Sequence, residues 1–321
     1  MSQQSLDSEF EPTDEQVSQG LIVLGSINID LVVTGKALPK PGETVTGGSF
    51  FKANGGKGAN QAVAAARGGL SPVHLVGAVG NDQFGNNLLP ELEAESRLDT
   101  RYIRTIEDME TGIAVILVGD DGENCISVAP GANHAFDPER AIEAIQNCIS
   151  GCNVLLACTE LPLNTVRAGL EIAKSNGLLT ILNPAPVIEG LQDESLLSLV
   201  DIITPNEHEA AQLTGIDVTD VVSAEKAGRI LQEKGINTVL ITVGETGVVL
   251  IDNQVIQIPA PIVEATDTTA AGDCFNGVFA ALMCESTDLA TSAEYAVNAA
   301  SISVTRPGAQ PSIPIRSEFL P

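Results

Sequence analysis

Tryptophan is absent from this 321-residue chain, and only 3% of its residues are aromatic. Hydrophobic residues nevertheless make up 44% of the sequence, which excludes wholesale disorder and leaves a core built mainly from Ala, Val, Leu and Ile. The length suits either two average domains or a single large α/β domain.

Positive charge is also scarce: 16 Lys and Arg stand against 42 Asp and Glu, and the formal net charge is −26. Such an acidic surface repels phosphate backbones and anionic lipid, so we expect no nucleic-acid partner and no membrane partner. No apolar run approaches the roughly 18 residues of a spanning helix. An anionic ligand would need local help from backbone N–H groups, a cation or a metal.

Histidine and cysteine offer little chemistry. The three histidines are scattered along the chain, at His74, His134 and His208. They provide neither a Ser-His-Asp triad nor a His-rich metal centre. Among the six cysteines, Cys148, Cys152 and Cys158 are close in sequence, but no zinc-binding pattern includes them. We therefore expect free thiols in a reducing compartment.

Residues 1–20 are expected to form a disordered acidic tail, and residues 21–321 a single α/β domain. The tail has no base, and its acidic residues are Asp7, Glu9, Glu11, Asp14 and Glu15. It lacks the pattern of a signal peptide. We expect a soluble intracellular protein, located in the cytoplasm or, if a transit peptide has been removed, in a plastid or another organelle.

Apolar runs and helix-forming segments alternate after the tail. Buried strands are expected at 21–24, 73–76, 154–157, 179–182, 202–204 and 239–242. Helices are expected at 60–67, 87–94, 138–146, 163–175, 207–213, 224–234 and 291–302, and from Ala271 onward. This alternation predicts a mostly parallel sheet flanked by helices on both faces.

Two insertions, at about 29–53 and 112–130, interrupt the alternation. Short strands are expected at 29–33, 43–46, 112–118 and 124–128, and Asp121-Gly122 is typical of the tight turn in a hairpin. We expect the two insertions to pair as a small β lid.

The segment Thr266–Asp273 (TDTTAAGD) precedes an apolar helical stretch that starts at Phe275. This places a helix N-terminus at Ala271–Asp273, where free backbone N–H groups and the helix dipole stabilise negative charge. Asp273 could take a proton from a substrate hydroxyl there. Alternatively, it is only a first-turn acidic residue favoured by the dipole.

A second glycine-rich loop, Asn54–Asn60 (NGGKGAN), also leads into a helix. It is not a Walker A loop, because Lys57 is followed by Gly58 rather than by Ser or Thr. Lys57 and Asn60 offer donors to hydroxyls or phosphate, although a flexible turn with an exposed lysine fits the pattern as well.

The first strand is followed by Gly25–Asp30 (GSINID), which lacks the glycine pattern of a dinucleotide fold. Asn28 and Asp30 could bind the vicinal hydroxyls of a sugar, or could belong to an ordinary polar turn.

Two further turns follow predicted strands. In Thr204–Glu209 (TPNEHE), Asn206 and Glu209 form the pattern of a capping box. The functional alternative is that Glu209 orients water around Mg²⁺. Thr242–Gly247 (TVGETG) suits either a phosphate or a hairpin.

Taken in order, these segments resemble the ribokinase-like family of carbohydrate kinases from about Leu21 to Pro314. The resemblance rests on GSINID (25–30), PGETV (41–45), GGKGANQ (55–61), NPAP (183–186), TPNE (204–207), DTTAAGDCFN (267–276) and GAQPSIP (308–314). It implies a doubly wound α/β domain with a β lid. It also implies ATP-dependent phosphorylation of D-ribose at the 5-hydroxyl, giving D-ribose 5-phosphate and ADP by in-line transfer with Mg²⁺ and K⁺.

The resemblance also implies residue roles. Asp273 would be the catalytic base, and the backbone N–H groups of Ala271 and Gly272 the anion hole. The sugar would be bound by Asn28, Asp30, Gly56, Lys57, Gly58, Asn60, Glu160 and Asp273. ATP would be bound by Asn206, Thr242, Gly244, Glu245, Gly247, Gly272, Asp273 and Asn298. Glu209 would act on Mg²⁺ through water, and K⁺ would be held by Asp267, Thr269, Ser303, Arg306 (through its carbonyl), Gly308 and Ser312.

Some positions depart from the family pattern. Cys274 follows the base where Thr is common, and Val297 and Asn298 lie where a nucleotide-contacting residue often occurs. The alternatives are the same chemistry on fructose or a nucleoside, a non-catalytic sugar sensor, and an NAD-dependent oxidoreductase. A homodimer that pairs through the lid is expected, with Val32 and Val115 as exposed apolar residues.

Overall fold

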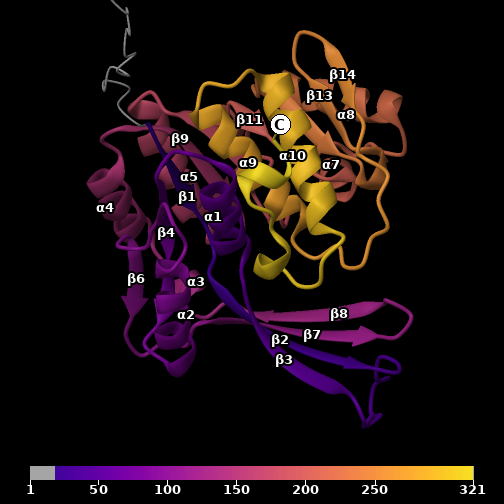
Figure 1. The fold of residues 1–321 in the computed structure, drawn as a ribbon. Helices are drawn as coiled ribbons and strands as arrows, with labels where there is room; N and C mark the ends of the chain where they lie inside the picture. The colour runs from indigo at the N-terminus through magenta and orange to yellow at the C-terminus, as the bar shows by residue number, and fades with distance from the viewer. Residues whose placement is uncertain (1–18, 321) are drawn as a thin grey trace, which may run out of the picture.

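The computed structural model describes residues 19–320. Figure 1 shows helices on both sides of a central sheet, and a small sheet that projects below this body. Most of the predicted tail lies outside the described residues, but Gly20 is buried and already begins the first strand. Its N–H donates to the carbonyl of Gly151 at 2.6 Å, which ties the start of the strand to the body.

In the main sheet, β1 (Gly20–Leu24) lies between β4 (Val73–Gly80) and β9 (Cys152–Cys158). On one side lie β4, β5 (Leu98–Asp99) and β6 (Ile103–Ile106). On the other side lie β9, β10 (Leu179–Asn183), β11 (Ile202–Ile203), β12 (Thr238–Thr242), β13 (Val248–Ile251) and β14 (Val255–Ile258).

The strand order is β14-β13-β12-β11-β10-β9-β1-β4-β5, with β6 also paired to β4. Only the β12-β13 and β13-β14 pairs within the described residues of this sheet are antiparallel; the others are parallel. The chain leaves β1 toward β4 and then returns to β9 on the opposite side. This confirms the doubly wound, mostly parallel sheet.

Helices cover both faces of the sheet. On one face lie α1 (Lys57–Gly68), α2 (Gln83–Glu93), α9 (Ala271–Cys284) and α10 (Leu289–Ser303). On the other lie α4 (Pro138–Cys148), α5 (Leu163–Ser175), α7 (Glu207–Thr214) and α8 (Val221–Glu233), with the short α3 (Ala132–Ala135) and α6 (Glu194–Leu197). Alternate residues of β1 serve the two cores: Leu21 packs in the first, and Ile22 in the second.

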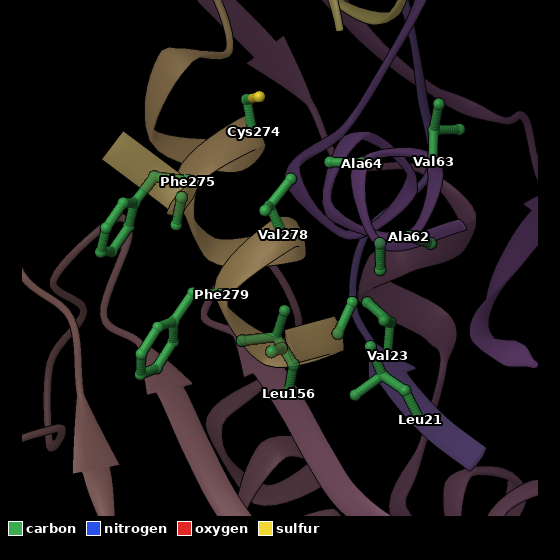
Figure 2. Packing of buried hydrophobic residues seen from close by; sticks show 14 of the residues in the cluster. Leu21, Val23, Ala62, Val63, Ala64, Leu156, Cys274, Phe275, Val278 and Phe279 are labelled. Carbon is green, nitrogen blue, oxygen red and sulfur yellow. The ribbon is translucent and has the colours of Figure 1, made fainter. Parts of the chain in front are cut away.

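The packing of α1 against α9 brings two distant segments together. Figure 2 shows Val278 of α9 facing Ala62 of α1, with the strand residues Leu156 and Leu21 below them, while Phe279 lies on the side of α9 away from α1. Small residues allow the two helices to approach closely. A side chain at Gly277 would collide with the carbonyl oxygen of Gln61, so the two backbones are in direct contact. This contact sets the spacing between the glycine-rich loop and the start of α9.

The lid is a separate sheet, with strand order β3-β2-β7-β8. It consists of β2 (Asn28–Gly35), β3 (Ser49–Gly55), β7 (Gly112–Gly119) and β8 (Asn124–Ala129). The two insertions therefore pair as predicted, through parallel β2 and β7. Val115 is 42% exposed, but Val32 is only 8% exposed, so the expectation that Val32 is exposed is wrong.

Two features of the fold differ from the predictions. The expected strand at 43–46 is a loop, because Glu43 closes a turn onto the carbonyl of Lys40 and the backbone of Gly47 has a φ of 93°. The strands β3, β5, β6, β13 and β14 were not predicted. Strand β5 has two residues, and β6, β13 and β14 have four each, which is too few to show a repeating pattern.

Candidate active site

The site forms where the strand order reverses, beyond the carboxyl ends of β1 and β9. Ligands bind at such a point in open α/β sheets. Ser26, just after β1, donates its hydroxyl to Oε2 of Glu160, just after β9, at 2.5 Å. The backbone N–H of Lys57 donates to the same oxygen at 3.1 Å. Glu160 thereby joins both strand ends to the start of α1.

The glycines of the Asn54–Asn60 loop allow close backbone approach. A Cβ on Gly25 would lie 2.6 Å from Cα of Gly58, so these two backbones touch. Gly56 has a φ of 87°, and a Cβ there would lie 2.7 Å from the backbone nitrogen of Asn28. The loop therefore holds Lys57 and the start of β2 together, as a flexible exposed turn would not.

At the start of α9, Ala270 takes a left-handed conformation with a φ of 60°. The first helical hydrogen bond runs from Cys274 N–H to the Ala270 carbonyl, at 2.8 Å. Ala271 N–H donates to the Thr268 carbonyl at 3.3 Å. The N–H groups of Gly272 and Asp273 precede the first helical hydrogen bond and therefore have no acceptor within the helix. These N–H groups lie at the positive end of the α9 dipole.

A cavity of about 230 Å³ opens in front of this helix end. Its lining residues come from the ends of several strands and helices: Lys57, Asn183, Ala185, Thr204, Asn206, Glu209, Thr242, Thr268, Ala270, Ala271, Gly272, Asp273 and Asn276. An added Cβ on Gly272 would meet nothing within 4 Å, so its backbone faces open space. The cavity therefore gives a ligand direct access to the free amides.

The Asp273 carboxyl is buried, with 7% of the residue exposed, and it accepts two hydrogen bonds. Asn60 donates to Oδ2 at 2.9 Å, and Gln61 donates to Oδ1 at 3.1 Å. Burial raises the pKa of Asp273, while the Lys57 ammonium and the Asn60 amide act against that rise. In turn, the Asp273 carboxylate raises the pKa of Lys57, which keeps this lysine charged.

Asn28 and Asp30 lie at the base of the lid, beside Lys57. Asn28 is 4% exposed, and its Oδ1 accepts a hydrogen bond from Asn133 at 2.8 Å. Asp30 is 9% exposed, and burial, reinforced by the nearby carboxylate of Glu160, raises its pKa to about 6. Residues predicted to bind the sugar thus surround one side of Asp273.

The residues predicted to bind ATP lie in three places. Asn206, Thr242, Gly272 and Asp273 line the cavity. Gly244, Glu245 and Gly247 form the turn between β12 and β13, where Gly247 has a φ of 98°. Asn298 is on α10 and is not among the residues that line the cavity.

Glu209 lines the same cavity, and the predicted capping box at the start of α7 is confirmed. Oε2 of Glu209 accepts the Asn206 N–H at 2.9 Å, and burial raises the pKa of the Glu209 carboxyl. Among the described residues, no group of three or more His, Cys, Asp or Glu is arranged to hold a metal ion.

Asp267 ties the segment before α9 to the segment after α10. Its carboxylate accepts N–H groups from Thr269 at 2.9 Å and from Gly308 at 2.8 Å. Burial alone would raise the pKa of Asp267, but these hydrogen bonds together hold it below its ordinary value. Ser303 and Ser312, which lie on either side of Gly308 in the sequence, are fully buried, and Arg306 donates its N–H to the Ser303 carbonyl at 3.0 Å.

Several residues of the site were not predicted. Asn183, Thr204 and Asn276 line the cavity, and Gln61, Asn133 and Gln310 contact the predicted residues. The sequence could have indicated Asn183 as a site residue, since this polar residue directly follows the predicted strand at 179–182, at the carboxyl edge of the sheet. Gln310 lies 250 residues from Asn60 in sequence, and no local pattern indicates that contact.

The chain matches the pfkB family of carbohydrate kinases over residues 18–316. It is 45% identical over 301 residues to a ribokinase of Haemophilus influenzae, covering 94% of this chain and 97% of that protein. It is 36% identical to a deoxyribokinase of Salmonella typhi, covering 93% and 97%. A structure of Arabidopsis thaliana ribokinase with ribose and ATP superposes with a TM-score of 0.84 at 31% identity, covering 94% and 98%. None of the helices in the range 19–320 has the length and apolar character needed to cross a membrane.

Proposed function

Because this chain belongs to the pfkB family of carbohydrate kinases, we propose that it transfers the γ-phosphoryl group of ATP to the 5-hydroxyl of D-ribose, giving D-ribose 5-phosphate and ADP. One observation supports this most: the Asp273 carboxylate lies between the sugar-binding candidates at the base of the lid and the cavity at the start of α9. A sugar on one side and a nucleotide on the other would meet at this carboxylate.

The sugar would be held by groups that suit a small polyhydroxyl ligand. Asp30 and Glu160 supply carboxylate acceptors, and Asn28, Lys57 and Asn60 supply donors. Gly56 and Gly58 let the loop pack directly against the backbone of residues 25–28, which would hold their own backbone groups and Lys57 in place for the sugar. The lid would close over the sugar and exclude water, which would otherwise compete for the phosphoryl group.

Asp273 would act as the general base for the sugar hydroxyl. Burial raises the pKa of Asp273, which gives the carboxylate more affinity for the proton that it must accept, and the Lys57 ammonium acts against that rise. A positioned base of this kind contributes about 10²–10⁴ in rate.

Backbone amides at the start of α9 would stabilise the transferring phosphoryl group. The N–H groups of Gly272 and Asp273 have no intrahelical acceptor, and the dipole of α9 favours negative charge at that end. Ala271 would contribute less than predicted, because its N–H already contacts the Thr268 carbonyl. Charge spreads over the phosphoryl oxygens during transfer, so fixed donors of this kind carry much of the catalysis.

ATP would lie along Asn206, Thr242, Gly244, Glu245, Gly247 and Asn298, with its terminal phosphate in the cavity. The chemistry of the donor set fits Mg²⁺ held chiefly by the nucleotide phosphates and water, since Glu209 is a carboxylate with Oε1 still available to orient a bound water. Mg²⁺, when bound, neutralises charge on the phosphates.

A monovalent cation, K⁺, would be held beside the anion hole by Asp267, Thr269, Ser303, Arg306 (through its carbonyl), Gly308 and Ser312. The fit rests on the donor set, which consists only of oxygen atoms: a carboxylate, hydroxyls and carbonyls. Asp267 already joins the 267–269 and 308 segments through backbone N–H groups. These residues would fix the loop that leads into Ala271 and Gly272.

The lid would also form the contact surface of a homodimer. All of β8 is exposed, and Ile126 and Val128 present apolar side chains at 54% and 51% exposure. At the opposite edge of the lid, Phe50 of β3 is 62% exposed. Apolar side chains gathered on a projecting sheet favour burial against a second copy of the same sheet. All six cysteines are free, which favours a reducing intracellular compartment.

The proposed function is tested by an ADP-release assay with D-ribose as acceptor, run against 2-deoxyribose, fructose and a nucleoside. We expect D-ribose to give the highest kcat/KM. ADP release without an acceptor reports water attack and serves as the blank. A higher kcat/KM for one of the other acceptors would overturn the substrate assignment, and the absence of transfer to every sugar would overturn the kinase assignment.

A further inference from the structure

Gln61 contacts the proposed base although none of the roles implied by the family resemblance falls on it. It follows Asn60 on α1 and is completely buried. Its Nε2 donates two hydrogen bonds, one to Oδ1 of Asp273 at 3.1 Å and one to Oδ1 of Asn183 at 3.0 Å. Gln61 therefore links the carboxylate at the start of α9 to the carboxyl end of β10.

The orientation of the Gln61 amide is fixed by a chain of contacts that ends at the backbone. Asn183 donates its Nδ2 to the carbonyl of Thr204 at 3.1 Å. A carbonyl oxygen can only accept, so Asn183 must turn its Oδ1 toward Gln61. Gln61 must then present its NH₂ group, since the flipped amide would place Oε1 against two other oxygens.

This arrangement leaves one polar atom without a partner. Oε1 of Gln61 is buried, and no donor of the described residues reaches it. Such an unpaired acceptor is costly and uncommon in folded proteins. The backbone of Gln61 cannot move away, because Gly277 of α9 packs directly against its carbonyl. The local structure thus favours two donated bonds over a partner for Oε1.

We propose that Gln61 is a positioning residue for phosphoryl transfer, which fixes the Asp273 carboxylate toward the substrate hydroxyl by donating to its Oδ1. The proposal rests on the role of Asp273 as base. With Gln61 on Oδ1 and Asn60 on Oδ2, the carboxylate cannot rotate about its Cβ–Cγ bond without losing both hydrogen bonds. Each oxygen keeps a second lone pair for the hydroxyl proton.

A neutral amide suits this role because it stabilises the carboxylate without removing its basicity as a paired cation would. Charged and titratable groups from every side face Asp273: Lys57, Asp30, Glu160, Glu209, Cys158 and Cys274. Burial and the Glu160 carboxylate raise the pKa of Asp273, while Lys57 and the Asn60 and Gln61 amides lower it. The loss of the Gln61 donor would therefore raise the pKa of Asp273 further.

The test compares Gln61→Met with Gln232→Met in the full-length enzyme. Gln232 of α8 also donates from Nε2 to two backbone carbonyls, those of Asn237 and Asp252, but it lies far from the site. We measure kcat, both KM values and the pH profile of kcat by ADP release with D-ribose. For Gln61→Met we expect kcat to fall 10- to 100-fold, KM values within threefold of wild type, and the acid limb of kcat moved up by about one pH unit. Gln232→Met should leave the pH profile and both KM values unchanged.

If Gln61→Met does not fold, Gln61→Glu is the second variant to test, because it keeps the shape of the side chain. Its second carboxyl should move the acid limb upward by at least as much. An unmoved acid limb in a folded Gln61 variant, or a kcat within twofold of wild type, would overturn the positioning role. A wild-type enzyme that does not phosphorylate ribose would instead overturn the proposed function, so the two failures are distinguishable.

Discussion

Asn133 holds the first residues of the lid by three hydrogen bonds. Its Oδ1 accepts the Ile27 N–H at 2.9 Å, and its Nδ2 donates to the Ile27 carbonyl at 3.1 Å and to Oδ1 of Asn28 at 2.8 Å. Because Oδ1 of Asn28 is occupied, its NH₂ group is left to face the ligand. Asn133 on α3, just beyond the last lid strand, therefore sets which hydrogen-bonding group Asn28 would present to the proposed sugar ligand.

Asn133→Asp should weaken sugar binding. The change replaces the donor with an oxygen that faces two other oxygens, so the Asn28 amide should flip or move. A buried hydrogen-bonding group left unpaired costs about 1–3 kcal/mol, so we expect KM for ribose to rise by about 5- to 100-fold with a smaller change in KM for ATP. Steady-state kinetics with each substrate varied measures this. Asn153→Asp is the matched control, because Asn153 also donates to a backbone carbonyl but lies at the opposite end of the sheet. Equal effects of the two variants would contradict the role of Asn133.

The sequence predicted the parts of the site that depend on local pattern. Lys57 begins α1 and Asp273 lies in the first turn of α9, each after a glycine-rich or small-residue segment, so the residues expected to act lie where the local pattern predicts a helix start. Asn133 and Gln310 could not be predicted in this way, since each contacts a residue more than 100 positions away. Only the packing of α1 against α9 and the return of the chain to the lid bring those groups together.

The same reasoning explains the fold. Buried parallel strands such as β9 and β10 are continuous apolar runs, so their positions follow from composition alone. The two-residue strand β5 and the loop at 43–46 depend on tertiary contacts with neighbouring segments, whereas the equally short β11 falls within the apolar run predicted at 202–204. Exposure is also set by tertiary contacts, which is why Val32 is buried although its lid neighbour Val115 is exposed.

The pH dependence of sugar binding should follow Asp30. Burial raises the pKa of Asp30 to about 6, and its ionised form is the better acceptor for sugar hydroxyls. We therefore expect kcat/KM for ribose to fall as the pH drops through about 6 in the free enzyme. The profile of kcat/KM from pH 5 to 8 measures this. An acid limb that is the same in wild type and Asp30→Asn would contradict the assignment.

Asp30 should also lower the stability of the unliganded protein at neutral pH. A carboxyl with a raised pKa in the folded state contributes most to stability below about pH 4, and this contribution is lost as the pH rises through about 6. Asp30→Asn should therefore raise the free energy of unfolding at pH 8 by up to about 3 kcal/mol and weaken ribose binding. Denaturant unfolding at pH 4 and pH 8 gives the difference, and a variant less stable than wild type at pH 8 would be inconsistent with it.

Turnover should depend on the monovalent cation. We expect a higher kcat in K⁺ than in Na⁺ at matched ionic strength, because the 267–269 segment leads directly into the amides of Gly272 and Asp273. Asp267→Asn should reduce this difference. Equal rates of the wild type in the two salts would count against the cation site.

The lid should mediate self-association. Ile126→Lys places a charge on the exposed apolar strand β8, and we expect sedimentation at several concentrations to give a monomer for this variant and a dimer for wild type. Val222→Lys on α8 is the matched control, since Val222 is similarly exposed at 59% but lies on a helix of the body. A dimer that survives in Ile126→Lys would place the contact elsewhere.

The most direct measurement for the whole account is the turnover of Asp273→Asn, which keeps the side-chain shape but removes the base. Asp288→Asn makes the same change at the start of α10 and controls for an altered helix terminus. We expect kcat of Asp273→Asn to fall by at least about 10²-fold, with the ribose affinity measured by calorimetry within threefold of wild type. Near-normal turnover in Asp273→Asn would contradict the central claim that this carboxylate removes the proton from the sugar.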